Sequence, residues 1–349
     1  MTRNSKRALG VISAATAVLA LCAGPAMADP GAYRPLAGAG SDTTQYVLGG
    51  LGEAISIGGA KVIGSYDAIG SATIQTRAAG PSFVRPNGSG NGVKALTASI
   101  NPTGAYLWNG VEITGQLDFA RSSSGPSTAG DDLTYIPFAK DAVTYAFSDA
   151  GNASVPAQLT VDDLAAIYRG QVTTYQDNNG VTRAYIPMLP QAGSGTRSFF
   201  LQKIGVAESE IGWITSIVQE NDGQEVDAIG EIVPFSVASW IAQDNDVVPN
   251  TVNDNAVTTG AIDDDMYGVV PAVEFGLLNP DFPITRQVYN VVQTSRLTSE
   301  APADVLLQQT FAGAESAVCG ATATITAYGF GVIADCGDTT TYRSGYVVP

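Results

Sequence analysis

Hydrophobic positions along the chain follow two alternating patterns. Short runs rich in Val, Ile, Tyr and Phe are typical of buried strands, and they predict strands over residues 61–66, 142–147, 184–188 and 287–292. Between these runs, apolar residues recur at helical spacing and predict helices over residues 44–54, 92–100, 161–168, 196–204, 208–217 and 303–311. The alternation of strands and helices predicts an α/β protein.

Turns rich in Gly and Ser precede three of these helices. They are Gly38-Ala39-Gly40-Ser41-Asp42-Thr43-Thr44, Asn87-Gly88-Ser89-Gly90-Asn91-Gly92 and Gly193-Ser194-Gly195-Thr196. A fourth segment of this kind, Arg121-Ser122-Ser123-Ser124-Gly125, follows the strand end Leu117-Asp118-Phe119. Turns of this composition at helix starts are the informative feature of the sequence.

The chemistry of such turns favours an oxyanion ligand. A helix start leaves four backbone N–H groups without partners, and the helix dipole adds about half a positive charge there. Glycine lets the backbone approach a ligand, while Ser and Thr supply hydroxyl donors. Three such turns around one cleft would therefore bind a small oxyanion. Ordinary helix capping by Asp42, Ser89 and Thr196 is the alternative interpretation of each turn taken alone.

The composition excludes several classes of function. The chain of 349 residues has 45% hydrophobic residues, enough for a substantial core, and its length suggests two domains or one domain in two lobes. It contains no His, which excludes a Ser-His-Asp triad and histidine metal ligands. Seventeen basic residues against 33 acidic ones, without a basic tract, argue against a nucleic-acid partner. No turn matches a Walker A motif or a dinucleotide fingerprint, so we expect no cofactor.

The first 28 residues have the features of a secretory signal peptide. Arg3, Lys6 and Arg7 precede an apolar stretch, and Ala26-Met27-Ala28 is a small-x-small cleavage site. We therefore expect cleavage after Ala28 and a secreted protein, either periplasmic or associated with the cell envelope. Cys319 and Cys336 would remain, and an oxidising compartment favours a disulfide between them over two free thiols. Two cysteines without histidine do not make a zinc site.

Several segments, taken in chain order, resemble one protein family. They are the opening loop Gly38-Ala39-Gly40-Ser41, the segments Asn87-Gly88-Ser89-Gly90 and Leu117-Asp118-Phe119-Ala120-Arg121-Ser122-Ser123, the helix from Leu159-Thr160 to Tyr168-Arg169-Gly170, the loop Gly193-Ser194-Gly195-Thr196-Arg197, and the segments 218–230 and 282–289. Together they are similar to the periplasmic phosphate-binding protein of ABC phosphate transporters. The resemblance implies a type II periplasmic-binding-protein fold, with two lobes joined by two crossing strands. Lobe one would contain residues 29–140 and 286–349, and lobe two residues 141–285.

The resemblance implies a phosphate site in the cleft between the lobes. Its expected residues are Ser41, Asp42, Thr43, Arg85, Ser89, Gly90, Ser122, Ser123, Gly193, Ser194, Gly195, Thr196 and Arg197. The chain departs from the family pattern twice. Ser123 stands where the family has an Asp that accepts the proton of phosphate, and Pro190 stands where it has an Arg. We expect Asp42 and Arg85 to replace these two groups, with Arg121 and Arg197 as other candidate cations.

The implied function is capture of inorganic phosphate by a monomer, for delivery to the membrane subunits of an ABC permease. Three alternatives remain open at this point. The ligand can be another small oxyanion, the protein can be an extracellular interaction protein without a transport role, or Ser194 can be the nucleophile of a secreted phosphatase or serine hydrolase. We do not expect an enzyme, because the chain has no His to serve as base and no Lys lies near Ser194 in sequence.

Overall fold

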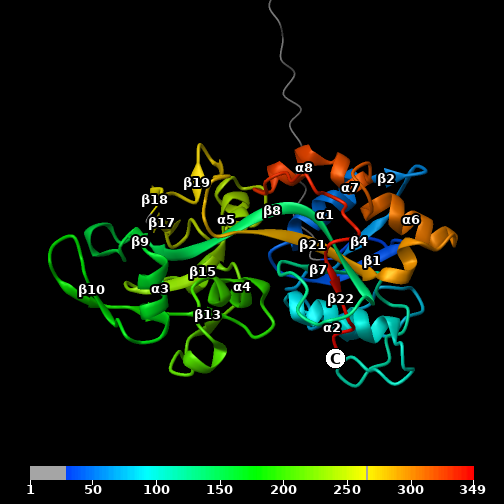
Figure 1. Cartoon of the computed structure of the whole chain (residues 1–349), viewed down its shortest axis with the longest axis horizontal. Coiled ribbons are helices and arrows are strands. Elements are labelled where there is room, and N and C mark those ends of the chain that lie inside the picture. The colour runs from blue at the N-terminus through cyan, green and yellow to red at the C-terminus, as the bar shows by residue number, and fades with distance from the viewer. Residues whose placement is uncertain (1–28, 265) are drawn as a thin grey trace, which may run out of the picture.

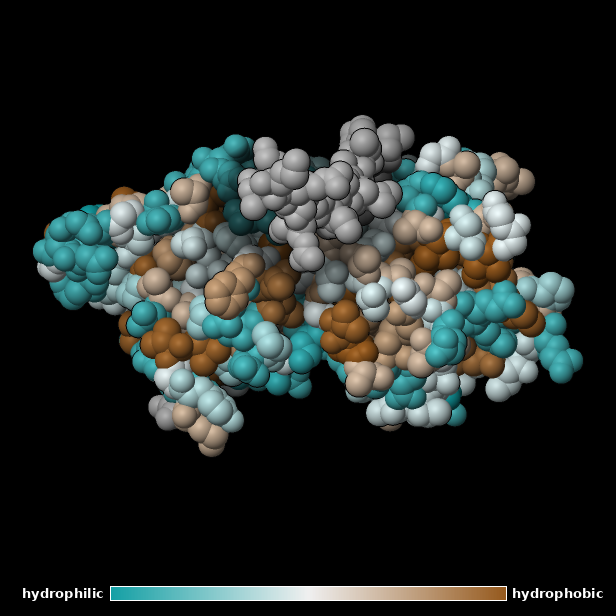
Figure 2. Space-filling model, turned by 90° about the horizontal axis from the view of Figure 1, so that it is seen from above, coloured by the Kyte–Doolittle hydropathy of each residue, from teal (hydrophilic) through white to brown (hydrophobic). Residues whose placement is uncertain are grey.

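The computed structural model describes residues 29–264 and 266–349, and within them the molecule consists of two α/β halves (Figure 1). Figure 2 shows an elongated molecule whose lower margin is notched between the halves. The predicted signal peptide and its cleavage site lie outside the described residues. Among the described helices, none is long and apolar enough to cross a membrane.

One mixed sheet extends through both halves in the order β12-β15-β8-β21-β7-β1-β4, and β16 and β22 also pair with β8. Its strands are β1 (Leu36–Gly40), β4 (Ile63–Ser65), β7 (Phe119–Ser122), β8 (Leu133–Ser148), β12 (Ile186–Pro187), β15 (Glu231–Ser236), β16 (Val257–Thr259), β21 (Thr285–Gln293) and β22 (Arg343–Ser344). β1, β4 and β7 are parallel, as expected where helices connect strands.

Eight α-helices accompany the sheet in the described residues. They are α1 (Gln45–Ala54), α2 (Ser89–Ile100), α3 (Val161–Tyr168), α4 (Gly195–Lys203), α5 (Val237–Asp244), α6 (Pro302–Phe311), α7 (Ala317–Gly320) and α8 (Thr322–Ala327). Figure 1 places α3, α4 and α5 in one half, and the other helices in the half that contains β1 and the C-terminus. α1, α2 and α4 follow the three Gly- and Ser-rich turns.

Short strands form small additional sheets. They are β2 (Ser56–Ile57) with β3 (Ala60–Lys61), β5 (Thr73–Ile74) with β6 (Phe83–Val84), β9 (Gln158–Leu159) with β17 (Ala261–Asp264) and β18 (Gly268–Val270), β10 (Thr174–Gln176) with β11 (Thr182–Ala184), β13 (Leu189–Pro190) with β14 (Ile217–Val218), and β19 (Val273–Glu274) with β20 (Leu277–Leu278).

The two halves are joined by β8 and β21, the two long antiparallel strands that cross from one half to the other in Figure 1. Nearly every residue of β8 is buried, because the strand is covered on both faces as it crosses. Asp141 pairs with Arg286 in the register, at the predicted lobe boundaries. The largest hydrophobic core cluster draws only on residues 142–284. We propose residues 29–140 with 286–349, and 141–285, as the two lobes.

Most predicted elements are present, with two exceptions. The expected helix over residues 208–217 is wrong: a 3₁₀ turn at Glu208–Glu210 is followed by the short strand β14. Gly212, within a segment rich in β-branched residues, lowers the helix propensity there. The expected strand over residues 184–188 is divided between two sheets, because Ala184 ends β11, which pairs with β10, whereas β12 at Ile186–Pro187 pairs with β15.

The predicted disulfide between Cys319 and Cys336 is confirmed. Their Cα atoms are 5.8 Å apart and 17 residues separate them in sequence. The bond connects α7 to the segment that precedes β22. In the chain-entropy model, closing a loop of this length stabilises the fold by about 3 kcal/mol.

Candidate functional site

The Gly- and Ser-rich turns meet between the two halves. The Oγ atoms of Ser89 and Ser123 are 3.2 Å apart, and so are the Oγ1 atoms of Thr43 and Thr196. Thr196 lies in the first turn of α4, in the half that contains α3, α4 and α5, whereas the other three residues belong to the half that contains β1 and the C-terminus. Segments separated by more than 150 residues in sequence therefore place their hydroxyls in one cluster.

Gly195 lies directly against the hydroxyls of Ser89 and Ser123. A Cβ atom built on it would lie 2.3 Å from the Ser123 Oγ and 2.4 Å from the Ser89 Oγ, so a larger residue would displace both hydroxyls. The backbone also bridges the halves, because Gly90 N donates to Gly193 O at 3.1 Å. Glycine at position 195 therefore leaves room for the two serine hydroxyls beside the start of α4.

Arg286 supplies the positive charge of the cluster. Its Nη2 donates to Thr196 Oγ1 at 2.8 Å and to Thr43 Oγ1 at 3.2 Å, and it forms an ion pair with Asp141 at 2.8 Å. Arg286 Nη1 and Ser41 Oγ are buried without a hydrogen-bond partner. Buried polar groups are normally paired, so these two donors are free for a ligand. Arg286 was not predicted as a site residue, because it lies in none of the Gly- and Ser-rich turns. Its signal in the sequence is its position next to the predicted strand over residues 287–292.

The other arginines considered from the sequence lie elsewhere. Arg85 pairs with Asp29 at 2.7 Å and donates to Ser71 at 2.7 Å. Arg197 pairs with Glu208 at 2.6 Å. The structure therefore replaces Arg85 by Arg286 as the cation of the cluster.

Arg121 and Ser122 have structural partners. The Arg121 guanidinium is fully buried and donates to Ser41 O at 3.1 Å and Ser65 Oγ at 2.9 Å, and burial lowers its pKa to about 10. Ser122 Oγ donates to Ser124 O at 2.7 Å. Arg121 thus fixes the loop that carries Ser41, and Ser122 fixes the turn after β7.

Helix capping accounts for only one of the turns. Ser194 is the N-cap of α4, and its Oγ accepts from Arg197 N at 3.0 Å. The N-cap residues of α1 and α2 are Thr44 and Gly88, and neither makes a side-chain cap bond. Asp42, Ser89 and Thr196, the expected capping residues, are not N-caps. Their polar groups face other partners in and around the cluster.

Glu220 is a second site residue that sequence reasoning missed, although it lies in a segment that carries the family resemblance. Its Oε1 accepts from Thr43 Oγ1 at 3.1 Å and from Thr196 N at 3.2 Å. The residue is only 2% exposed, and its Oε2 has no hydrogen-bond partner. The Glu220 carboxylate therefore accepts hydrogen bonds from two donors that an oxyanion ligand would also use.

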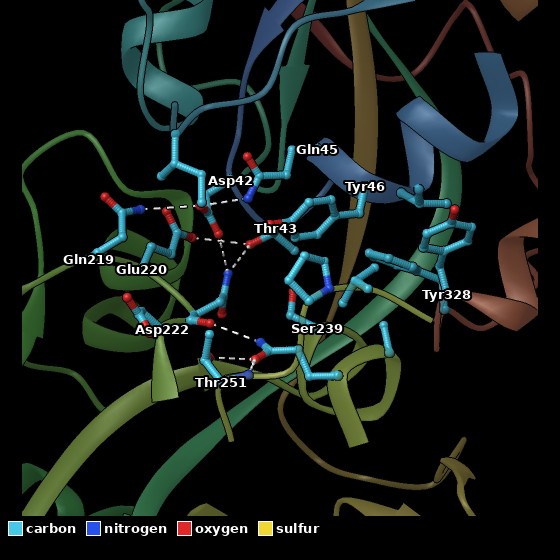
Figure 3. Close-up of a pocket in the computed structure, with 18 residues that line it drawn as sticks. Asp42, Thr43, Gln45, Tyr46, Gln219, Glu220, Asp222, Ser239, Thr251 and Tyr328 are labelled. Atoms are coloured by element: carbon cyan, nitrogen blue, oxygen red, sulfur yellow. Dashed lines mark hydrogen bonds between the residues drawn. The ribbon is translucent and has the colours of Figure 1, made fainter. Parts of the chain in front are cut away.

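Asp42 lies beside the cluster, in the small pocket of Figure 3. It accepts hydrogen bonds from Gln45 at 3.0 Å, Gln219 at 3.2 Å and Asn221 at 2.9 Å. Burial raises the pKa of Asp42 well above its usual value, and the nearby Glu220 raises it further. The pocket has a volume of about 150 Å³, with Tyr46 and Tyr328 on the side away from Glu220.

Side-chain amides hold the two halves together beside the cluster. Asn87 Nδ2 donates to Gln219 Oε1 at 3.0 Å, and Gln191 Nε2 donates to Asn87 Oδ1 at 2.8 Å. Together with the Gly90–Gly193 bond, these contacts cross from the turn before α2 to the other half. The structure is thus the closed form of a two-lobed molecule.

Comparison with known proteins identifies the family. A domain described as a PBP superfamily domain matches residues 30–308. The chain belongs to the PBP superfamily. It has the two-lobed periplasmic-binding-protein fold that the sequence resemblance implied.

Two solved structures share this fold with the PBP-superfamily chain. A substrate-binding protein from Clostridium perfringens, solved with bound phosphate, is 15% identical with a TM-score of 0.55; the match covers 85% of this chain and 99% of that one. An ABC-type phosphate transport receptor from Vibrio cholerae is 13% identical with a TM-score of 0.52, over 85% of this chain and 100% of that one. No curated protein matches the chain.

Proposed function

We propose that this protein captures inorganic phosphate in the cleft between its lobes and delivers it to an ABC uptake permease. The observation that carries the proposal is Arg286 Nη1, a buried donor without a partner on the guanidinium that binds Thr43 and Thr196. Ser41 Oγ, in the first of the turns, is likewise buried without a partner. A hydrogen bond to a charged group contributes about 1.5–3 kcal/mol. A few such bonds suffice for micromolar or tighter binding.

The proposed ligand contacts come from both lobes. Lobe one supplies hydroxyls from Ser41, Thr43, Ser89 and Ser123. Gly195 and Thr196 of lobe two supply the start of α4, whose dipole favours an anion. Gly90, Gly193 and Ser194 set the backbone around these contacts. Because both lobes hold the ligand, opening and closing about β8 and β21 would control its entry and release.

We propose that Glu220 replaces the missing family Asp as acceptor for the proton of hydrogen phosphate. It touches the donors of the cluster directly, whereas Asp42 already accepts three amide N–H bonds. A carboxylate in this place accepts a bond from hydrogen phosphate but repels fully ionised sulfate. Asp42, the selector expected from the sequence, is the alternative to be tested.

The proposed cellular setting combines the sequence and the fold. Secretion follows from the predicted signal peptide, with cleavage after Ala28. The Vibrio cholerae structure that shares the fold is described as a phosphate transport receptor, which supports an ABC permease as partner. We propose a monomer in the periplasm or at the cell envelope. Deletion of the gene is expected to slow growth when phosphate is scarce.

We propose binding without catalysis. Ser194, the one candidate nucleophile, has its Oγ engaged as the N-cap of α4. Turnover of a chromogenic phosphate ester that is lost in Ser194→Ala would contradict this. Capture of another small oxyanion remains the second candidate, because hydroxyl and amide donors bind any tetrahedral anion.

The decisive experiment is isothermal titration of phosphate into wild-type protein and two matched arginine variants. Arg286→Lys keeps the charge opposite Asp141 but loses the planar fork, so we expect phosphate affinity to fall about 10- to 100-fold. Arg85→Lys, which alters the Asp29 pair outside the cluster, should change it less than about threefold. Wild-type protein that binds neither phosphate nor sulfate would refute the proposal, and equal effects of the two variants would remove Arg286 from the site.

A further inference from the structure

A large cavity lies beside the anion cluster and is not needed for a free phosphate ion. Its volume is about 640 Å³, and Ser89 and Ser194 belong both to its wall and to the turns described above. Cavities of about 300–1,000 Å³ are typical of sites for whole small molecules. The cavity therefore has room for a group attached to the phosphate.

The wall of this cavity combines neutral polar groups with an aromatic ring. Its polar lining residues include Ser124, Ser127 and Gln202, together with Ser122 and Ser198, whose hydroxyls donate to Ser124 O and Gly195 O. Hydroxyls and amides both donate and accept hydrogen bonds, as the hydroxyls of a polyol require. The ring of Phe199 adds an apolar surface.

Phe199 also connects the cavity to the anion cluster. The guanidinium of Arg286 lies 5.5 Å from the centroid of the Phe199 ring, so the ring has Arg286 on one side and contributes to the cavity wall. Arg286 itself does not line the cavity, but Ser89 does, and its Oγ lies 3.2 Å from Ser123 Oγ in the cluster. A phosphate group held by the cluster would thus have its ester oxygen beside the cavity at Ser89. The inference rests on the proposed function, because it needs phosphate at Arg286.

The charges around the cavity favour a neutral group over a second anion. Arg197 in its wall is paired with Glu208 at 2.6 Å, and Glu208 lines the cavity too. A second phosphate would therefore have to break this ion pair. A sugar or polyol needs only the neutral hydrogen-bonding groups that are already present.

We propose that the protein also binds phosphate monoesters of sugars or polyols, with the phosphate at Arg286 and the hydroxylated group in this cavity. Both the phosphate and the hydroxylated group of the ligand should contribute to the affinity. A phosphate ester without hydroxyls and a sugar without phosphate should each bind more weakly than the sugar phosphate.

Calorimetric titration of the full mature chain tests this with glucose 6-phosphate, ethyl phosphate, glucose and inorganic phosphate. We expect glucose 6-phosphate to bind at least about tenfold more tightly than ethyl phosphate, and glucose alone not to bind measurably. Glucose 6-phosphate that binds no better than ethyl phosphate, while inorganic phosphate binds, would overturn this inference and leave the proposed function intact. Binding of the sugar phosphate without inorganic phosphate would support the inference and refute the proposed ligand. Binding of neither would refute both.

A matched pair of glycine variants locates the sugar. Gly125 lines the cavity, and a Cβ atom on it would lie 3.7 Å from the Tyr289 hydroxyl, an ordinary contact. Gly125→Trp should place an indole ring in part of the cavity and reduce the preference for glucose 6-phosphate, with inorganic phosphate affinity changed less than about threefold. Gly212→Trp, where a Cβ atom meets nothing within 4 Å and which does not line the cavity, is the control. A preference that survives Gly125→Trp would place the sugar elsewhere and overturn the assignment.

Discussion

Arg286 and Glu220 carry opposite charges within one hydrogen-bond network at the centre of the molecule. Thr43 Oγ1 bonds to both side chains, accepting from Arg286 and donating to Glu220. Asp141 already balances the charge of Arg286. The carboxylate of Glu220 therefore has no cation of its own among these partners, which makes it the group most sensitive to the charge of a ligand.

Substitution of the two candidate carboxylates should separate their roles. We expect Glu220→Gln to reduce the preference for phosphate over sulfate at least about tenfold, because a neutral amide no longer repels sulfate. Asp42→Asn should leave that ratio within about threefold. The measurement is calorimetric titration of both anions into each variant at pH 7. The reverse result would restore Asp42 as the selector.

Asp67 gives stability a specific dependence on pH. Burial raises its pKa to about 7, and Asp67 is 4% exposed. Its unfolded value is about 3.9, so between these values the folded state binds the proton more tightly than the unfolded state. This contribution to stability is fully present below pH 4 and is lost as the pH rises through 7.

Asp67→Asn should therefore lose less stability than the wild type between pH 5 and pH 8. Urea unfolding at the two pH values measures this as the difference in the free energy of unfolding. Asp227→Asn, on an exposed residue, is the control. Identical pH profiles of wild type and Asp67→Asn would show that Asp67 ionises at its ordinary value.

At the scale of elements, the starts of α2 and α4 face each other across the cleft. Their contact is backbone to backbone, through Gly90 N and Gly193 O. Such contacts depend on the absence of side chains, and the two helices differ in how much space they leave. A Cβ atom on Gly90 would be 3.6 Å from its nearest neighbour, Gly193 O, whereas one on Gly195 would collide with two serine hydroxyls.

This difference predicts opposite results for two alanine variants. Gly195→Ala should force α4 away from Ser89 and Ser123 and lower phosphate affinity at least about tenfold. Gly90→Ala should bind phosphate normally and stabilise α2 by about 0.5–1 kcal/mol, because alanine suits a helix better than glycine. Titration calorimetry and thermal unfolding measure the two effects. Normal binding by Gly195→Ala would show that the lobes do not approach this closely when ligand is bound.

At the scale of the whole molecule, hydrogen bonds between the lobes add to the connection by β8 and β21, among them those of Thr43 to Thr196 and Glu220 and of Asp42 to Gln219 and Asn221. Asn87 makes two of them, to Gln191 and Gln219 of the other lobe. Each hydrogen bond contributes about 0.5–1.5 kcal/mol. The two Asn87 bonds are therefore one part of what holds the closed form, and a ligand bound by both lobes can shift the balance between open and closed forms.

Removal of the Asn87 side chain should favour the open form. We expect Asn87→Ala without ligand to have a larger radius of gyration in solution X-ray scattering than the wild type, and to bind phosphate about tenfold more weakly. Saturating phosphate should restore the compact form. Asn178→Ala, on the turn between β10 and β11 far from the cleft, is the control. An unchanged radius in Asn87→Ala would show that other contacts keep the lobes closed.

Local signals in the sequence predicted most of the helices, the turns of the site and the disulfide. Apolar spacing placed α1, α3, α4 and α6 within about a residue of their observed ends, because each helix buries one face. Glycine and serine marked the turns that meet in the cleft, because close backbone contacts require those residue types. The two cysteines of the predicted mature chain had only one possible partner each.

Only the tertiary structure decided which charged groups the site uses. Arg286 lies 90 residues from Thr196 and 243 from Thr43 in sequence, and Glu220 lies 177 from Thr43. No local pattern distinguishes them from Arg85 or Asp42, which stand nearer to the turns along the chain. Charges act through space, and the pairing of β8 with β21 and the closure of the lobes determine which of them face the ligand.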